Sequence, residues 1–152
     1  MLGVSSMGMV DITGKKEVMR IARARGRIKL RRETISRIME KRVEKGDVFE
    51  VTKVAIINAV KKTAELLPFC HPIRITHVNT DITLGEDYID VEVTVKSISK
   101  TGVEMEALIG ACVGLLNIWD MVKMYEKDES GNYPYTSVLE VRVLEKLKLE
   151  GA

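Results

Sequence analysis

The feature that most constrains the fold is the segment 89–96, in which apolar and polar side chains alternate without exception. It reads Ile-Asp-Val-Glu-Val-Thr-Val-Lys. Successive side chains of a β-strand point to opposite faces, so this alternation predicts a strand with one buried face and one solvated face. Other parts of the chain must therefore supply an apolar layer to cover the buried face.

Weaker strand signals lie on both sides of this segment. Residues 73–75 and 82–84 alternate in opposite phases, and the change of phase near His77 predicts a bulge or a bend. A turn is expected at residues 85–87, where the sequence is Gly-Glu-Asp. The last strand is expected over residues 139–145, where alternation resumes after a glycine- and proline-containing loop.

The beginning of the chain has less periodicity. Residues 13–25 are densely charged and carry a modest helix signal, and Gly26 interrupts them. Residues 27–31 could form a short strand, because their apolar side chains fall on one face.

Three helices are expected from apolar residues spaced three and four apart. The first covers residues 34–44 and begins at a cap on Thr34. The second covers residues 48–67, ends at Pro68, and is apolar on more than one face, which suggests burial on two sides or a subunit contact. The third covers residues 102–125 and has the strongest apolar stripe. Its members are Leu108, Cys112, Leu115, Trp119 and Val122.

The order of these elements predicts an α+β fold. A hairpin lies in the middle and helices connect the other strands, which implies an antiparallel sheet with helices packed on one face. The ferredoxin-like plan, a split β-α-β arrangement, is the natural form of such a sheet.

Composition excludes several classes of function. The net charge is +2, from 24 Lys and Arg against 22 Asp and Glu, which is too balanced to indicate a nucleic-acid or membrane partner. No apolar run reaches the roughly 18 residues of a membrane span, and no secretory signal is recognised. Cys70 and Cys112 could form a disulfide, but two free thiols in a reducing cytoplasm are the simpler interpretation. No metal-type spacing of ligands occurs.

Two short motifs in the first half carry residues suited to chemistry. Lys45, in Lys-Gly-Asp between two expected helices, can reach a phosphate as a compact charge, although Asp47 beside it can simply cap a helix. In Leu-Pro-Phe-Cys-His-Pro, residues 67–72, two prolines fix the pose of Cys70 and His71. His71 could carry a proton or bind a ligand, or its ring could be satisfied within the turn.

Two further motifs lie near the start and the end of the third helix. Glu104 and Glu106 follow Lys-Thr-Gly. Carboxylates are favourable at the N-terminus of a helix because of its dipole. They could also accept hydrogen bonds from a nucleobase or transfer protons. Asp120 and Lys123 are three residues apart and project together. They form either a surface ion pair of little consequence or a coupled acid–base pair.

The length of this helix limits how these motifs can combine. Glu106 and Asp120 are 14 residues apart, which on one helix is a separation of roughly 21 Å. One small pocket of a single subunit cannot comfortably use both. If both belong to one site, the chain is expected to be a homo-oligomer with sites at the interface.

Together, the order and spacing of KGDVF, LPFCHP, KTGVEMEA and the aspartate–lysine pair in IWDMVK closely resemble the molybdenum cofactor biosynthesis protein C family, the cyclic pyranopterin monophosphate synthase accessory proteins. The stretch MVDITGK from Met9 is also similar to that family's N-terminus. The resemblance covers about residues 9–147. It makes residues 1–8 an N-terminal extension, expected to be flexible, and residues 9–152 a single catalytic domain.

The resemblance implies a ferredoxin-like fold and a homohexamer, a trimer of dimers with active sites at the dimer interface. It also implies an activity, the conversion of the cyclised GTP derivative 3′,8-cyclo-7,8-dihydro-GTP to cyclic pyranopterin monophosphate with release of pyrophosphate. Such an enzyme is a phosphorus–oxygen lyase. Neither a cofactor nor a metal ion enters this expectation.

The same resemblance implies roles for individual residues. Asp120 is expected to be catalytic, with Lys123 as its acid–base partner and Lys45 as the active-site lysine. Arg31 is expected to support the triphosphate, and the adjacent Arg32 is the alternative. The residues implied to bind the substrate are Phe69, Cys70, His71, Glu104, Met105, Glu106 and Arg31.

The competing interpretation is a ferredoxin-like binding module. RNA-binding versions stack bases on sheet aromatics. Here the clearest strand offers only Tyr88 at its start and exposes Asp90 and Glu92, which argues against RNA. A small-ligand regulatory module without catalysis stays open, but such a module would not need Lys45, Asp120 and Lys123.

Overall fold

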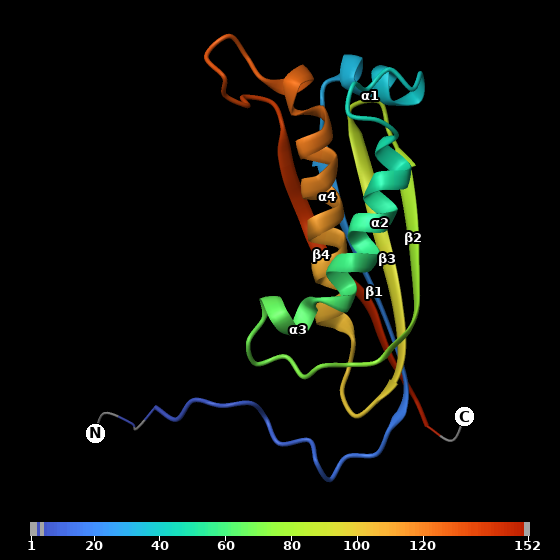
Figure 1. Cartoon of the computed structure of the whole chain (residues 1–152), viewed down its shortest axis with the longest axis vertical. Helices are drawn as coiled ribbons and strands as arrows, with labels where there is room; N and C mark the ends of the chain where they lie inside the picture. Colours follow the sequence, from blue (N-terminus) through green and yellow to red (C-terminus); the bar gives the residue numbers. More distant parts are fainter. Residues whose placement is uncertain (1–2, 4, 151–152) are drawn as a thin grey trace.

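The fold is an antiparallel four-stranded sheet with helices on one face (Figure 1). The computed structural model describes residue 3 and residues 5–150. The strands are β1 (Val18–Lys29), β2 (Ile75–Leu84), β3 (Tyr88–Ser99) and β4 (Ser137–Leu149), in the sheet order β2-β3-β1-β4. The helices are α1 (Arg32–Met39), α2 (Val48–Lys61), α3 (Thr63–Leu66) and α4 (Glu104–Glu126). This is the ferredoxin-like arrangement that the order of elements predicts.

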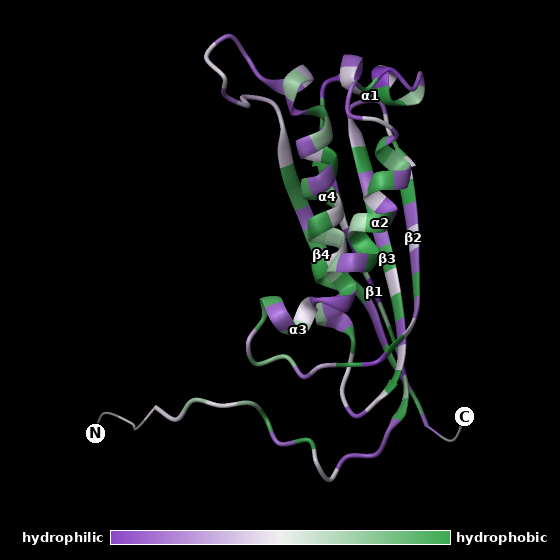
Figure 2. Ribbon diagram, in the orientation of Figure 1, coloured by the Kyte–Doolittle hydropathy of each residue, from purple (hydrophilic) through white to green (hydrophobic). Residues whose placement is uncertain are grey.

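The alternating segment forms the centre of β3, as predicted. Its four apolar side chains, Ile89, Val91, Val93 and Val95, are fully buried beneath the helices. The opposite face carries ion pairs, such as Arg27 with Asp90 at 2.7 Å, which keep its side chains only partly exposed. Figure 2 shows the same alternation of apolar and polar residues along the strands.

The helix signal at residues 13–25 is wrong, because residues 18–25 belong to one long strand, β1, which also includes residues 27–29 of the expected short strand. Its buried face includes small side chains such as Ala22 and Ala24, which alternate with arginines. Alanine and arginine both favour helices, so this segment has a helix signal although it forms a strand. Gly26 does not interrupt the strand. A Cβ at Gly26 would lie 2.6 Å from the Leu115 side chain, so the glycine lets α4 pack close to the sheet.

The first predicted helix is shorter than residues 34–44, since α1 ends at Met39 and Lys41 has a φ of 55°. Val43 lies in the loop after α1, and its side chain is buried in the core. Its position therefore extends the apolar pattern of the sequence beyond the end of the helix. Thr34 is not a cap. Its hydroxyl donates to Glu126, a fully buried carboxylate that also accepts from Thr136 at 2.6 Å.

The predicted second helix, residues 48–67, is divided into α2 and α3. The side-chain hydroxyl of Thr63 donates to the carbonyl oxygens of Ala59 and Val60, a local bond that competes with continuation of the helix. The cap at the start of α2 is Asp47, whose carboxylate accepts the Glu50 amide at 3.0 Å.

The remaining elements agree with the sequence patterns. The pairing of β2 with β3 shifts register between Ile75 and His77, which confirms the expected bulge. The turn at residues 85–87 and the loop before β4 are also present. By length and composition alone α4 could cross a membrane, but 50% of its most apolar stretch is buried inside the domain. Packing in the core therefore accounts for its apolar character.

Candidate active site

The predicted site residues fall into two groups at opposite ends of α4. The lysine–aspartate group, at the end of α4, consists of Lys45, Asp120 and Lys123, with Arg31 at the same end. The glutamate–histidine group, at the start of α4, consists of Phe69, Cys70, His71, Glu104, Met105 and Glu106. Because α4 is one helix of 23 residues, the two groups stay roughly 21 Å apart within one subunit.

In the lysine–aspartate group, one carboxylate lies between two ammonium groups. Lys123 Nζ is 3.3 Å from Asp120 Oδ1 and Lys45 Nζ is 3.5 Å from Asp120 Oδ2. Lys45 Nζ also donates to the main-chain oxygen of Asp120 at 2.8 Å. The hydrogen bond from Lys123 and then the charge of Lys45 lower the pKa of Asp120 below its usual value, so the carboxylate is ionised at neutral pH.

Local structure brings these three residues together across 75 positions of sequence. Asp120 and Lys123 are one helical turn apart on α4. Lys45 lies in the loop between α1 and α2, which Val43 anchors in the core. Gly46 follows with a φ of 119°, a conformation that side-chain-bearing residues rarely adopt. The chain can therefore turn sharply from Lys45 into α2.

Arg31 lies at the same end of α4 but bonds to a different residue. Its main-chain amide and its guanidinium both donate to Glu126, at 3.1 Å and 3.4 Å. Arg31 lines an open hollow of about 770 Å³ whose other charged residues are Lys127, Glu33, Asp128 and Glu129. Arg32 instead pairs with Glu86 at 3.2 Å on the surface.

The glutamate–histidine group surrounds a cavity of about 250 Å³. Glu106 is only 4% exposed there. Burial, and to a smaller extent the charge of Glu104, raises the pKa of Glu106 to about 7. Glu104 Oε1 accepts from Lys146 at 3.1 Å, while Glu104 Oε2 is buried and has no hydrogen-bond partner within the described part of the chain.

Residues 69–71, which lie between two prolines, form another part of the cavity wall. His71 Nε2 lies 2.7 Å from the main-chain oxygen of Val10, to which it donates. Burial raises the pKa of the Cys70 thiol, so Cys70 is not a thiolate at neutral pH. Phe69 is 51% exposed and Met105 is 37% exposed. Their apolar surfaces can cover a flat ring.

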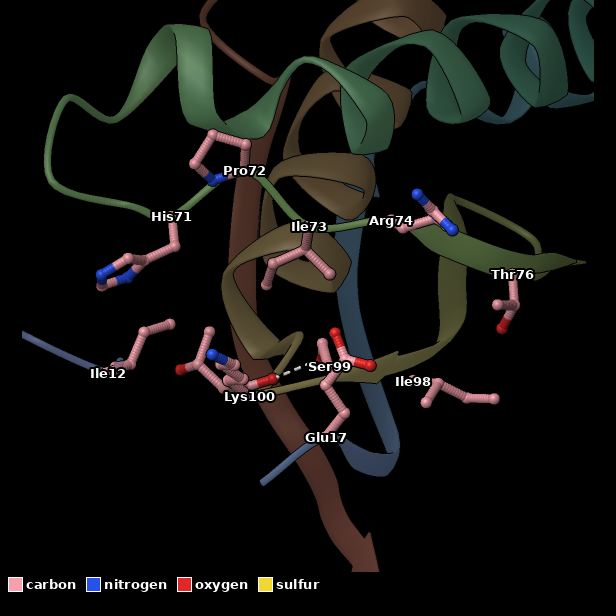
Figure 3. Close-up of a pocket in the computed structure, with 11 residues that line it drawn as sticks. Ile12, Glu17, His71, Pro72, Ile73, Arg74, Thr76, Ile98, Ser99 and Lys100 are labelled. Carbon is pink, nitrogen blue, oxygen red and sulfur yellow. Dashed lines mark hydrogen bonds between the residues drawn. The ribbon is translucent and has the colours of Figure 1, made fainter. Parts of the chain in front are cut away.

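Sequence reasoning missed several polar residues beside this cavity. His71 and Ile73 also line an adjoining hollow of about 550 Å³, to which Arg74 and Lys100, the lysine of the Lys-Thr-Gly motif, bring positive charge and Glu17 brings negative charge (Figure 3). Lys146, the partner of Glu104, lies in β4. Strand alternation marks Lys146 only as an exposed side chain, so no local signal could have assigned it. Across residue 3 and residues 5–150, no three His, Cys, Asp or Glu side chains are grouped as metal ligands.

Comparison with known proteins settles the family. The model of the MoaC family matches residues 9–148. The chain belongs to the MoaC family. This confirms the resemblance drawn from the four motifs, and the match spans both groups of predicted site residues.

MoaC relatives from several archaea carry the same name. A protein of Pyrococcus furiosus is 55% identical over 93% of this chain and 91% of its own length. A protein of Methanosarcina acetivorans is 54% identical over 92% and 89%, and one of Sulfurisphaera tokodaii is 55% identical over 92% and 93%. Each is named a probable cyclic pyranopterin monophosphate synthase.

The raised pKa of Glu106 predicts a pH-dependent stability. Its pKa is about 7 in the folded chain, whereas the ordinary value for a glutamate is 4.5. The carboxyl therefore binds its proton more tightly when folded, and its contribution is complete below pH 4.5 and lost as pH rises through 7. Wild-type stability should fall over this range by up to about 3 kcal/mol relative to Glu106→Gln, whose side chain does not ionise.

Urea unfolding at a series of pH values measures this difference. Glu65→Gln, a change on an exposed glutamate of α3, is the matched control and should follow the wild type. Parallel curves for wild type and Glu106→Gln would show that Glu106 is not protonated by burial.

Proposed function

We propose that this chain is a cyclic pyranopterin monophosphate synthase of molybdenum cofactor biosynthesis. Its substrate is 3′,8-cyclo-7,8-dihydro-GTP, its products are cyclic pyranopterin monophosphate and pyrophosphate, and its class is phosphorus–oxygen lyase. The observation that carries the proposal is the contact of Lys45, Asp120 and Lys123, which joins two family motifs 75 positions apart. The names of the relatives support the same activity.

The lysine–aspartate group suits the phosphate chemistry. A hydroxyl of the substrate attacks the α-phosphorus and loses its proton, and the bond from that phosphorus to the bridging oxygen breaks as pyrophosphate leaves. Asp120, kept ionised by its two lysines, can accept a proton directly or through Lys123. In this proposal Lys45 and Arg31 are the cations that neutralise charge developing on the leaving group.

The glutamate–histidine group is suited to binding the purine ring of the substrate. Rebuilding a purine into a pterin exposes several N–H groups, and the free oxygen of Glu104 and the carboxyl of Glu106 are acceptors for them. A carboxyl with a pKa of about 7 can also give or take a proton near neutral pH. Phe69 and Met105 supply the apolar walls.

The separation of the two groups supports an assembly in which each site takes one group from each of two subunits. The outer face of α2 carries Val51, Val54 and Ile57, which are 42%, 59% and 38% exposed. Side chains of this kind along one helix are suited to a subunit contact. The proposed assembly is a homohexamer, a trimer of dimers. Residues 9–152 are its catalytic domain, residues 1–8 an extension, and the cytoplasm its compartment.

The direct test supplies purified protein with the cyclised GTP derivative. Pyrophosphate and the cyclic-phosphate pterin should appear together in equal amounts. Absence of both products from folded protein would contradict the proposal. A regulatory module would instead bind the ligand without turnover, and would keep binding it when Lys45, Asp120 and Lys123 are replaced.

A further inference from the structure

A tyrosine of α4 contacts the loop that carries Lys45. The Tyr125 hydroxyl accepts the main-chain N–H of Glu44 at 2.9 Å, and Glu44 directly precedes Lys45 in the chain. Tyr125 follows Asp120 by five residues on the same helix. One helix therefore carries both the carboxylate that Lys45 contacts and a side chain that bonds to the loop of Lys45.

Arg37 of α1 contacts both Tyr125 and the loop that carries Lys45. Its guanidinium carbon lies 4.3 Å from the centre of the Tyr125 ring, a distance typical of a cation–π contact. Arg37 Nη1 donates to the main-chain oxygen of Arg42 at 3.3 Å. Tyr125 and Arg37 together thus bond the loop at positions 42 and 44, on either side of Val43.

The loop has main-chain bonds within its own turns, such as those from the Arg42 and Gly46 amides to the oxygens of Arg37 and Val43, but it is the Tyr125 hydroxyl that ties its main chain to α4. Among residues 40–47, Val43 alone is buried. Lys41 and Gly46 both have positive φ angles, of 55° and 119°, so the backbone changes direction at each end. A displacement of about 1 Å in a group that contacts the reacting atoms can lower a rate by up to about 10²-fold. The position of the Lys45 ammonium therefore depends on these contacts.

We propose that Tyr125 is a positioning residue that sets the contact between Lys45 and Asp120 by fixing the loop against α4. Tyr125 acts through Lys45 and not on the substrate itself. The kinetic part of this inference rests on the proposed function, whereas the clamping of the loop does not.

The test compares wild type with Tyr125→Phe, which removes the hydroxyl and keeps the ring. Amide hydrogen exchange in the peptide covering residues 40–47 should become about tenfold faster, the effect of losing one hydrogen bond. Exchange in the strands should not change. The turnover number should fall about tenfold with little change in KM, because Lys45 is displaced while the purine ring of the substrate is still bound.

A double-mutant cycle separates positioning from a general loss of stability. In the Lys45→Ala background, Tyr125→Phe should cause no further loss of turnover, because the residue that it positions is gone. Tyr88→Phe is the matched control, since within the described residues the Tyr88 hydroxyl makes no side-chain hydrogen bond, and it should leave exchange and turnover unchanged.

Two results would overturn the inference. One is unchanged exchange at residues 40–47 in Tyr125→Phe. The other is a loss of turnover in the Lys45→Ala background as large as in the wild type. If the wild type itself does not turn over the cyclised GTP derivative, the proposed function fails, and the exchange result still decides whether Tyr125 holds the loop.

Discussion

Replacing Asp120 by alanine is expected to lower turnover of the cyclised GTP derivative by roughly 10²–10⁴-fold, the contribution of a positioned acid–base group. The carboxylate lies 3.3 Å from the Lys123 ammonium and 3.5 Å from that of Lys45. Its removal takes away the proton acceptor and leaves two like charges facing each other. Initial rates of pyrophosphate release at saturating substrate measure the loss.

The fold should survive this change. The Asp120 side chain is 61% exposed, and exposed substitutions usually alter stability by no more than about 0.5 kcal/mol. Asp120→Asn, which keeps the shape and removes the charge, should lose nearly as much activity as Asp120→Ala. Asp81→Ala, on an exposed aspartate of β2, should be fully active. Turnover near the wild-type rate in Asp120→Ala would remove Asp120 from the catalytic role.

The sequence predicts most reliably those elements that carry a long, regular row of apolar residues. β3 is found where its alternation places it, because every second side chain from Ile89 to Val95 is fully buried. α4 is found for its length and its row of large apolar residues, although its most deeply buried positions also include small residues such as Ala107 and Gly114. β1 fails for the opposite reason. The middle of its buried face consists of Ala22, Ala24 and Gly26. Their small size allows α4 to pack close to the sheet, and no local sequence pattern reveals that requirement.

Buried polar contacts were beyond prediction for a similar reason. Glu126 ends α4 and reads as an ordinary exposed helix terminus, yet it is fully buried and binds Thr34 and Thr136. Its partners come from a distant helix and a distant loop. Only the fold brings them together, so the sequence alone predicts a helix cap at Thr34.

For the site residues too, the sequence predicts chemical suitability, whereas the fold determines which residues lie together. Local motifs identify Lys45, Asp120 and Glu106 as chemically suitable, but each motif alone is equally well explained by a cap, a turn or a surface ion pair. The family pattern selects them together. The structure adds that Lys45 contacts Asp120, and that Glu106 lies at the far end of the same helix.

Because the two groups lie at opposite ends of α4, mixing two inactive variants tests most directly whether each active site is shared between two subunits. Asp120→Ala disables the lysine–aspartate group, and Glu104→Ala disables the glutamate–histidine group by removing the carboxylate that Lys146 holds. Each variant alone should be nearly inactive. In a dimer of one variant with the other, one of the two sites combines two damaged groups and the other combines two intact ones.

The experiment co-expresses the two variants with different affinity tags, purifies the assemblies, and measures pyrophosphate release from the cyclised GTP derivative. Random pairing makes half of the dimers mixed, and each mixed dimer has one intact site of two, so about a quarter of wild-type activity should return. The variants purified separately and combined without subunit exchange serve as the control. Recovery of about a quarter is the result predicted for a site shared between subunits. A co-expressed mixture no more active than the separate variants would contradict it.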